Sequence, residues 1–204
     1  MSLGITLPET PVARAAAEVC AGYCSPALVN HCVRSYLWAV SYGTQHDIGF
    51  DAELLYVSAM LHDIGLVPEF DSHTVPFEEA GAHVAWVFGA GAGWPVERRA
   101  RAAEIIVRHM WDEVDPSFDP EGHLLELATG LDISGRHPEW WPSDLRDGIV
   151  SAYPRLGLGE EFVRCFRDQA RRKPDSLAGR AMASGIAERI AANVLDRPGQ
   201  GLPA

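Results

Sequence analysis

Apolar residues recur at intervals of three and four along most of the chain, and no segment shows a long alternation of apolar and polar positions. This period is typical of helices that bury one face, whereas half-buried strands need alternation. Cap-like dipeptides such as Thr10-Pro11 and Ser25-Pro26 open segments, and Gly43 and Gly65 close them. The pattern predicts nine helices, at about residues 11–21, 26–43, 51–65, 77–88, 95–111, 120–132, 143–153, 160–172 and 175–195.

The predicted fold class is all-α, a single-domain helical bundle of about eight or nine helices over residues 1–204. A chain of 204 residues buries roughly 70% of its unfolded surface, which is enough for one core. C-terminal helices are expected over about residues 143–195. The segment 197–204 is rich in Pro and Gly, so we expect a frayed tail there.

Composition narrows the classes of function. The chain has 17 Lys and Arg residues against 28 Asp and Glu residues, so its formal net charge is −11. Nucleic acid is not an expected partner, because a phosphate lattice attracts a basic face. A membrane is not expected either, because no apolar run reaches the roughly 18–20 residues that span a bilayer and no secretory signal is recognised. The four cysteines form no dense framework, which predicts free thiols and a cytoplasmic protein.

Two histidines and two aspartates stand out within or at the ends of predicted helices: His31, the adjacent pair His62-Asp63, and Asp132. Two imidazoles with two carboxylates suit a divalent ion of borderline hardness. Adjacent residues on a helix point about 100° apart, so both members of the pair reach one ion only if it lies beside the helix end. Gly65 would let the backbone leave the helix there through a left-handed conformation. Taken singly, each of these residues fits an ordinary cap or core position better.

The same residues carry a resemblance to a known family. Their order and flanks resemble the metal-binding signature of the HD-domain superfamily of metal-dependent hydrolases, and within it the cyanamide hydratase-like branch. The likeness covers about residues 25–137. It rests on five segments, Asn30-His31-Cys32-Val33-Arg34, Leu61-His62-Asp63-Ile64-Gly65-Leu66, Phe77-Glu78-Glu79-Ala80-Gly81-Ala82, Val107-Arg108-His109 and Gly130-Leu131-Asp132-Ile133-Ser134-Gly135.

The resemblance implies an all-α fold with one divalent ion bound by His31, His62, Asp63 and Asp132. Zinc is the favoured ion, and Mn, Fe, Co and Ni are the alternatives. It also implies that His109 lies near the ion and positions substrate or water. Asp63 and His109 are therefore the predicted catalytic residues.

Two departures from the family pattern bear on the chemistry. Many members with two metals carry a histidine shortly before the Gly-Ala pair, where this chain has Phe77 before Gly81-Ala82. This difference favours a single ion. Many phosphohydrolase members carry a lysine shortly after the His-Asp pair, whereas this chain has none between Ile64 and Pro68.

The predicted activity is that of a metal-dependent hydrolase or hydratase. A divalent ion lowers the pKa of its bound water, which then attacks a small, largely uncharged substrate similar to cyanamide or a nitrile. The interval from Tyr36 to Glu97 contains no lysine or arginine, which favours a neutral substrate. One alternative is a phosphohydrolase that acts on a nucleotide or another phosphomonoester, helped by Arg34, Arg108 and Arg136. A second alternative is a non-catalytic metal-binding signalling module.

Three residues are predicted to contact the substrate: Arg34, Arg108 and Trp111. The two arginines would meet any negative charge, and the indole would narrow the pocket. The expected partner is a small molecule. The aromatic content also leaves room for a homodimer interface.

Overall fold

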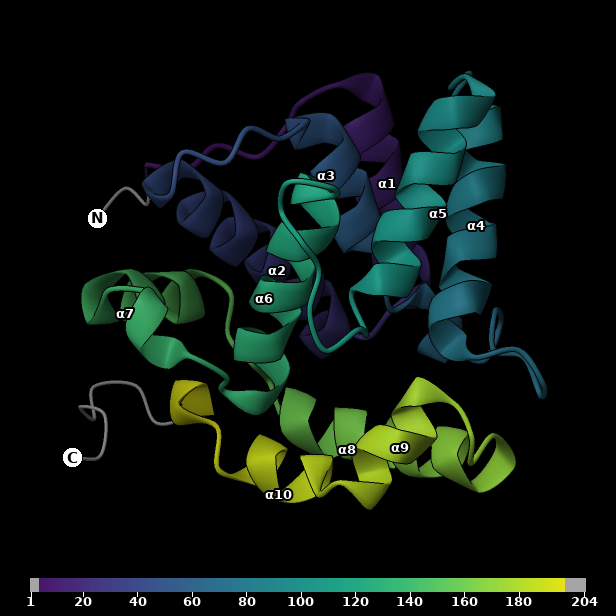
Figure 1. Cartoon of the computed structure of the whole chain (residues 1–204), viewed down its shortest axis with the longest axis vertical. Coiled ribbons are helices and arrows are strands. Elements are labelled where there is room, and N and C mark those ends of the chain that lie inside the picture. Colours follow the sequence, from purple (N-terminus) through teal and green to yellow (C-terminus); the bar gives the residue numbers. More distant parts are fainter. Residues whose placement is uncertain (1–3, 197–204) are drawn as a thin grey trace.

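The computed structural model describes residues 4–196, and this part of the chain contains ten α-helices, three short 3-10 helices and no strand (Figure 1). The α-helices are α1 (Pro11–Tyr23), α2 (Pro26–Gln45), α3 (Ala52–Leu61), α4 (Phe77–Gly91), α5 (Val96–Arg108), α6 (Pro120–Ser134), α7 (Ser143–Ala152), α8 (Leu158–Arg172), α9 (Leu177–Ala183) and α10 (Ile186–Ala191). The 3-10 helices are η1 (Ile64–Leu66), η2 (Pro138–Trp140) and η3 (Val194–Asp196). The all-α prediction is confirmed, and the tail predicted at 197–204 lies outside the described residues.

The predicted helix starts are built from side-chain caps. The hydroxyls of Thr10 and Ser25 each accept a hydrogen bond from a backbone N–H three residues later, at 3.1 Å. Asp51 does the same for α3 at 2.9 Å. These bonds satisfy donors that the first turn of a helix leaves free. The boundaries at these three positions therefore follow from local sequence alone.

Helix α3 lies at the centre of the bundle. Every residue from Leu54 to Leu61 is buried, as expected for a helix that is apolar all round. Helices α1, α2 and α5 pack against it, and α6 packs beside α2. Figure 1 shows α8, α9 and α10 as a row across the ends of these helices, so a cavity between the two groups has walls from both.

The C-terminal prediction needs a correction. The single helix expected over 175–195 is divided into α9, α10 and η3. The first break falls at Gly185, which has a φ of +80° and so adopts the left-handed conformation that favours glycine. The apolar spacing continues through the break, because both short helices bury residues against the same neighbours, and the periodicity therefore did not indicate the turn.

Two further predictions concern the surface and the thiols. No helix in residues 4–196 is long and apolar enough to cross a membrane. Cys20, Cys24 and Cys32 are buried free thiols, and Cys165 is a half-buried one. Burial raises the pKa of Cys165 to about 11, so this thiol stays protonated.

Candidate metal centre

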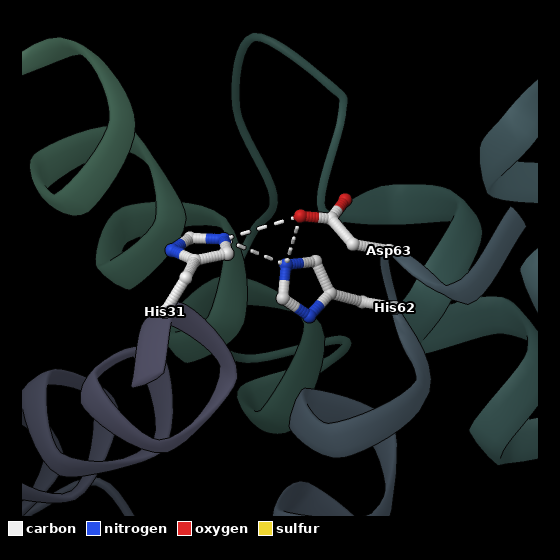
Figure 2. A group of neighbouring side chains, drawn as sticks. All are labelled: His31, His62 and Asp63. Carbon is white, nitrogen blue, oxygen red and sulfur yellow. Dashed lines mark hydrogen bonds and ion pairs between the residues drawn. The ribbon is translucent and has the colours of Figure 1, made fainter. Parts of the chain in front are cut away.

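Three of the predicted ligands meet at one point in the core. His31 Nε2 lies 3.1 Å from His62 Nε2 and 3.2 Å from Asp63 Oδ2, and His62 Nε2 lies 3.2 Å from the same oxygen. Figure 2 shows the three side chains pointing toward one another, His31 from α2 and the pair from the end of α3. All three residues are fully buried. Together they could hold a metal ion.

The His-Asp pair reaches this point because α3 ends at Leu61 and the chain turns into η1. The structure corrects the role expected of Gly65, which has no left-handed conformation. A Cβ at Gly65 would instead overlap the carbonyl oxygen of Phe77, and one at Gly81 would lie 3.0 Å from the carbonyl oxygen of His62. Both glycines therefore let α4 approach the turn that presents His62 and Asp63.

Hydrogen bonds to the outer nitrogens fix the tautomers of both rings. His62 Nδ1 donates to the carbonyl oxygen of Ala59 at 2.7 Å, and His31 Nδ1 donates to Asp132 Oδ2 at 2.7 Å. Each Nε2 then presents a lone pair to the common point, where Asp63 adds a carboxylate. Three acceptors that face one another at about 3 Å repel unless a cation lies between them. The arrangement therefore fits a divalent metal ion.

The carboxylate of Asp63 supports the same conclusion. Among the described residues no donor forms a hydrogen bond with either of its oxygens, although both are buried. A buried carboxylate without donors is costly unless a cation compensates it. Burial alone would raise the pKa of Asp63, but His62 and His31 hold it below its ordinary value. Asp63 is therefore an anion that can bind a cation.

The fourth predicted ligand, Asp132, lies elsewhere. Its Oδ2 accepts hydrogen bonds from His31 Nδ1 and Arg34 Nη2, both at 2.7 Å, and its Oδ1 accepts from Arg34 Nε and Trp38 Nε1, both at 2.8 Å. Four donors thus surround a carboxylate on the outer side of His31. The geometry gives Asp132 the role of orienting a ligand, which is common behind metal-bound histidines.

The same contacts place Arg34 away from any substrate. Its guanidinium is fully buried, and besides Asp132 it donates to the carbonyl oxygen of Tyr153 at 2.9 Å. Arg155 donates to the Asp132 carbonyl oxygen at 2.6 Å, and Asn193 does so at 2.9 Å. Burial alone would raise the pKa of Asp132, but Arg34 and His31 hold it well below its usual range. The predicted substrate contact of Arg34 is thus a structural one in the described fold.

His109 lies beside the three converging residues, as predicted. Its Nε2 is 3.9 Å from Asp63 Oδ1, and its ring packs against that of His62 with centroids 4.8 Å apart. His109 Nδ1 donates to the carbonyl oxygen of Ile106, so Nε2 carries the lone pair. Burial and the neighbouring His62 lower the pKa of His109 to about 3, which keeps the ring neutral.

The site opens into a cavity of about 470 Å³. Its lining includes His31, His62, Asp63, His109 and the predicted contact Trp111. Arg108 is not part of this lining. Instead it pairs with Asp119 at 2.6 Å and lies over the rings of Trp111 and Phe118.

Sequence reasoning missed two arginines of the cavity wall, Arg180 on α9 and Arg189 on α10. Both follow the metal motif by many residues, and the motif spacing gives no signal for them. The base-free interval between Tyr36 and Glu97 indicated little positive charge near the site. The C-terminal helices supply that charge from another part of the chain.

Comparison with known proteins agrees with this site. Residues 28–128 match the family described as the HD domain. This protein contains an HD domain. Over 172 residues it is also 27% identical to two proteins of Saccharomyces cerevisiae, cyanamide hydratase DDI2 and cyanamide hydratase DDI3. Each alignment covers 82% of this chain and 76% of the yeast protein. His31, His62 and Asp63 all fall within the matched HD domain.

Proposed function

We propose that this HD-domain protein is a metal-dependent hydrolase or hydratase that adds water to a small, uncharged group of the cyanamide or nitrile type. The observation that carries the proposal is the convergence of His31 Nε2, His62 Nε2 and Asp63 Oδ2, three buried acceptors without a donor between them, at the wall of an open cavity. The similarity to the two yeast cyanamide hydratases supports the nitrile-type group.

His31, His62 and Asp63 would hold the divalent ion, with zinc favoured by the mixed nitrogen and oxygen donors. When bound, such an ion lowers the pKa of a water molecule and polarises the group that is attacked. Asp132 keeps His31 in the tautomer that presents Nε2, and the Ala59 carbonyl does the same for His62. These two contacts prepare the ligands before any ion arrives.

Asp63 and His109 handle the proton. Asp63 Oδ1, the oxygen that faces His109, accepts a proton from water as the water oxygen bonds to the nitrile carbon. The proton then passes to the nitrogen as the C–N π bond breaks, so every atom of water is retained. His109 is neutral, and its Nε2 accepts a hydrogen bond that orients the water or a substrate amino group. With cyanamide the product is urea.

The charge around the reacting point supports a neutral reacting group. In the part of the chain that the structure describes, the ion-pair partners of Asp63 within 4.0 Å are three histidines and no lysine or arginine. Phosphoryl transfer places charge on several oxygens, which enzymes usually meet with cationic side chains or further metals. A phosphomonoester is therefore the second candidate, supported by the arginines farther along the cavity.

One experiment tests these alternatives together. Turnover is measured on cyanamide, small nitriles, nucleoside monophosphates and a generic phosphoester, and metal content is measured on the same sample. We expect about one divalent ion per chain and turnover of cyanamide or a nitrile. Phosphate release without nitrile hydration would favour the phosphohydrolase. Bound metal with no turnover on the whole panel would favour a signalling module, and absence of metal binding would contradict the proposal.

A further inference from the structure

The cavity is larger than cyanamide requires. Cyanamide has three non-hydrogen atoms, and a water molecule takes a share of about 30 Å³ in the liquid, so such a substrate fills on the order of 100 Å³. The cavity measures about 470 Å³, within the range of sites that bind ligands of many atoms. Most of its volume therefore lies beyond the reacting point, and the residues that line the rest can select a longer substrate.

Two of those residues are cations with no anionic partner. Arg180 and Arg189 line the cavity, and among residues 4–196 neither has a carboxylate oxygen within 4.0 Å in an ion pair. Arg180 Nη1 donates to the carbonyl oxygen of Asp175 at 2.6 Å, and Arg189 Nη1 donates to that of Ser184 at 2.7 Å. A carbonyl orients a guanidinium without neutralising it, so both keep donors and full charge for a ligand.

The third arginine of the lining behaves differently. Arg136 forms an ion pair with Glu126, which also lines the cavity, and its charge is therefore compensated. The remaining acids of the lining are Asp63, which belongs to the metal centre, and Asp112, which is exposed. The excess positive charge of the cavity wall thus comes from Arg180 and Arg189.

The turn between α9 and α10 brings these two arginines to one wall. A continuous helix over both positions would place residues nine apart about 13.5 Å apart along its axis. Gly185 interrupts the helix with its left-handed conformation, and Arg189 bonds back to Ser184 at the end of α9. The break that the sequence pattern did not indicate therefore has a consequence for binding.

We propose that the natural substrate is an organic oxyanion, with its neutral reacting group at the metal centre and its carboxylate or phosphate bound by Arg180 and Arg189. This inference rests on the proposed function for the reacting group, whereas the anion site stands on its own residues. Guanidinium groups recognise both oxyanions through paired N–H donors. The two sources differ in charge and size, and the experiment distinguishes them.

The test compares an uncharged nitrile, 4-cyanobutanamide, with a carboxylate, 4-cyanobutanoate, and a phosphate, 2-cyanoethyl phosphate. We expect one of the acidic nitriles to have a kcat/KM at least about tenfold above that of the neutral compound, since hydrogen bonds to charged groups contribute about that factor or more. The double variant Arg180→Ala, Arg189→Ala should remove this advantage through KM and change the neutral compound less than about twofold. Raising the ionic strength should also remove it, because salt screens exposed charges.

A matched control and a second readout keep the result unambiguous. Arg167→Ala removes an exposed arginine of α8 that does not line the cavity, and it should leave all three nitriles unchanged. If no nitrile is turned over, the proposed function fails, and calorimetric binding of the same compounds to the wild-type protein and the double variant still tests the anion site. Equal kinetics or equal binding for acidic and neutral nitriles, or acidic nitriles that are insensitive to the double variant, would overturn the inference.

Discussion

The two walls of the cavity are stabilised in different ways. On the metal side, fully buried residues of α2, α3 and α6 hold one another, and Asp132 alone accepts four hydrogen bonds from three side chains. On the other side, Arg180 and Arg189 stand on helices of 7 and 6 residues and bond to carbonyls of their own segments. Deeply packed elements open least often, so the reacting groups occupy the more rigid wall and substrate selection falls to the less rigid one.

The largest effect that separates the two walls is expected at the metal ligands. Asp63→Asn keeps the shape of the side chain but removes its charge, and His62→Ala removes a nitrogen donor. Each change should lower turnover by about 10³-fold or more and reduce metal content, because the ion loses a ligand and the reaction loses its activated water. Turnover and elemental analysis measure this, and circular dichroism should show retained helicity.

The matched control for these variants is His83→Ala, which removes an exposed histidine of α4. It should leave turnover and metal content unchanged. Global unfolding of Asp63→Asn would indicate that the site is structural, because structural ions contribute directly to the free energy of folding. Full turnover in Asp63→Asn would contradict the proposed proton transfer.

The sequence predicted the metal wall much better than the opposite one. His31, His62 and Asp63 belong to regular helices whose caps and apolar periods appear locally, so their neighbourhood could be expected. The position of Asp132 could not, because it depends on Trp38 and Arg34 donating to the carboxylate from another helix. Such contacts have no signature in spacing.

The opposite wall depends on a backbone conformation. Apolar spacing continues from Asp175 to Leu195, which predicts one helix, and only the left-handed φ of Gly185 divides it. A glycine within a helical pattern is tolerated often enough that its presence does not establish a break. The arginines of this wall therefore became visible only once the turn had placed them beside the cavity.

The next largest effect is expected at Asp132. Asp132→Asn leaves the buried Arg34 without its anion, which should lower the free energy of unfolding by about 3–5 kcal/mol. It should also weaken metal binding by about 10–100-fold, because His31 loses the acceptor that fixes its tautomer. Thermal unfolding and metal titration measure the two losses separately.

Asp119→Asn is the matched control for Asp132→Asn. Asp119 is also fully buried, and it pairs with Arg101 at 2.5 Å and with Arg108 at 2.6 Å on the far side of α5 and α6 from His31 in the contact network. It should destabilise the protein without changing metal affinity. Equal loss of metal binding in both variants would show that Asp132 acts only through stability.

A smaller effect is expected at Gly65. In Gly65→Ala the new Cβ would overlap the Phe77 carbonyl oxygen, so α4 or the turn after α3 must move. Overpacking of this kind costs about 1–3 kcal/mol, and turnover should fall with it because the same turn presents Asp63. Gly22→Ala is the control, since nothing lies within 4 Å of a Cβ there. That variant should be neutral or stabilising by up to about 1 kcal/mol, and equal effects of the two substitutions would contradict the proposed close approach.

The smallest effect concerns Glu78, on the first turn of α4, whose charge interacts with Lys173 and Arg180 of the C-terminal side. Glu78 is 2% exposed, and within residues 4–196 its Oε2 has no hydrogen-bond partner. Burial, with a smaller contribution from Glu79, raises the pKa of Glu78, and the two cations do not reverse this. The folded protein therefore binds this proton more tightly than the unfolded chain does. Its stability consequently falls as pH rises from the ordinary value of 4.5 through the raised one.

Glu78→Gln removes the charge while keeping the size of the side chain. At neutral pH the variant should melt about 2 °C higher than the wild type, because the cost of the buried anion is gone. The difference should vanish at about pH 4, where the wild-type carboxyl is protonated. Glu79→Gln, at an exposed neighbouring position, should show no such pH-dependent gain. A variant that melts lower than the wild type at neutral pH would mean that attraction to Lys173 and Arg180 exceeds the cost of burial, and that Glu78 helps to join the two walls.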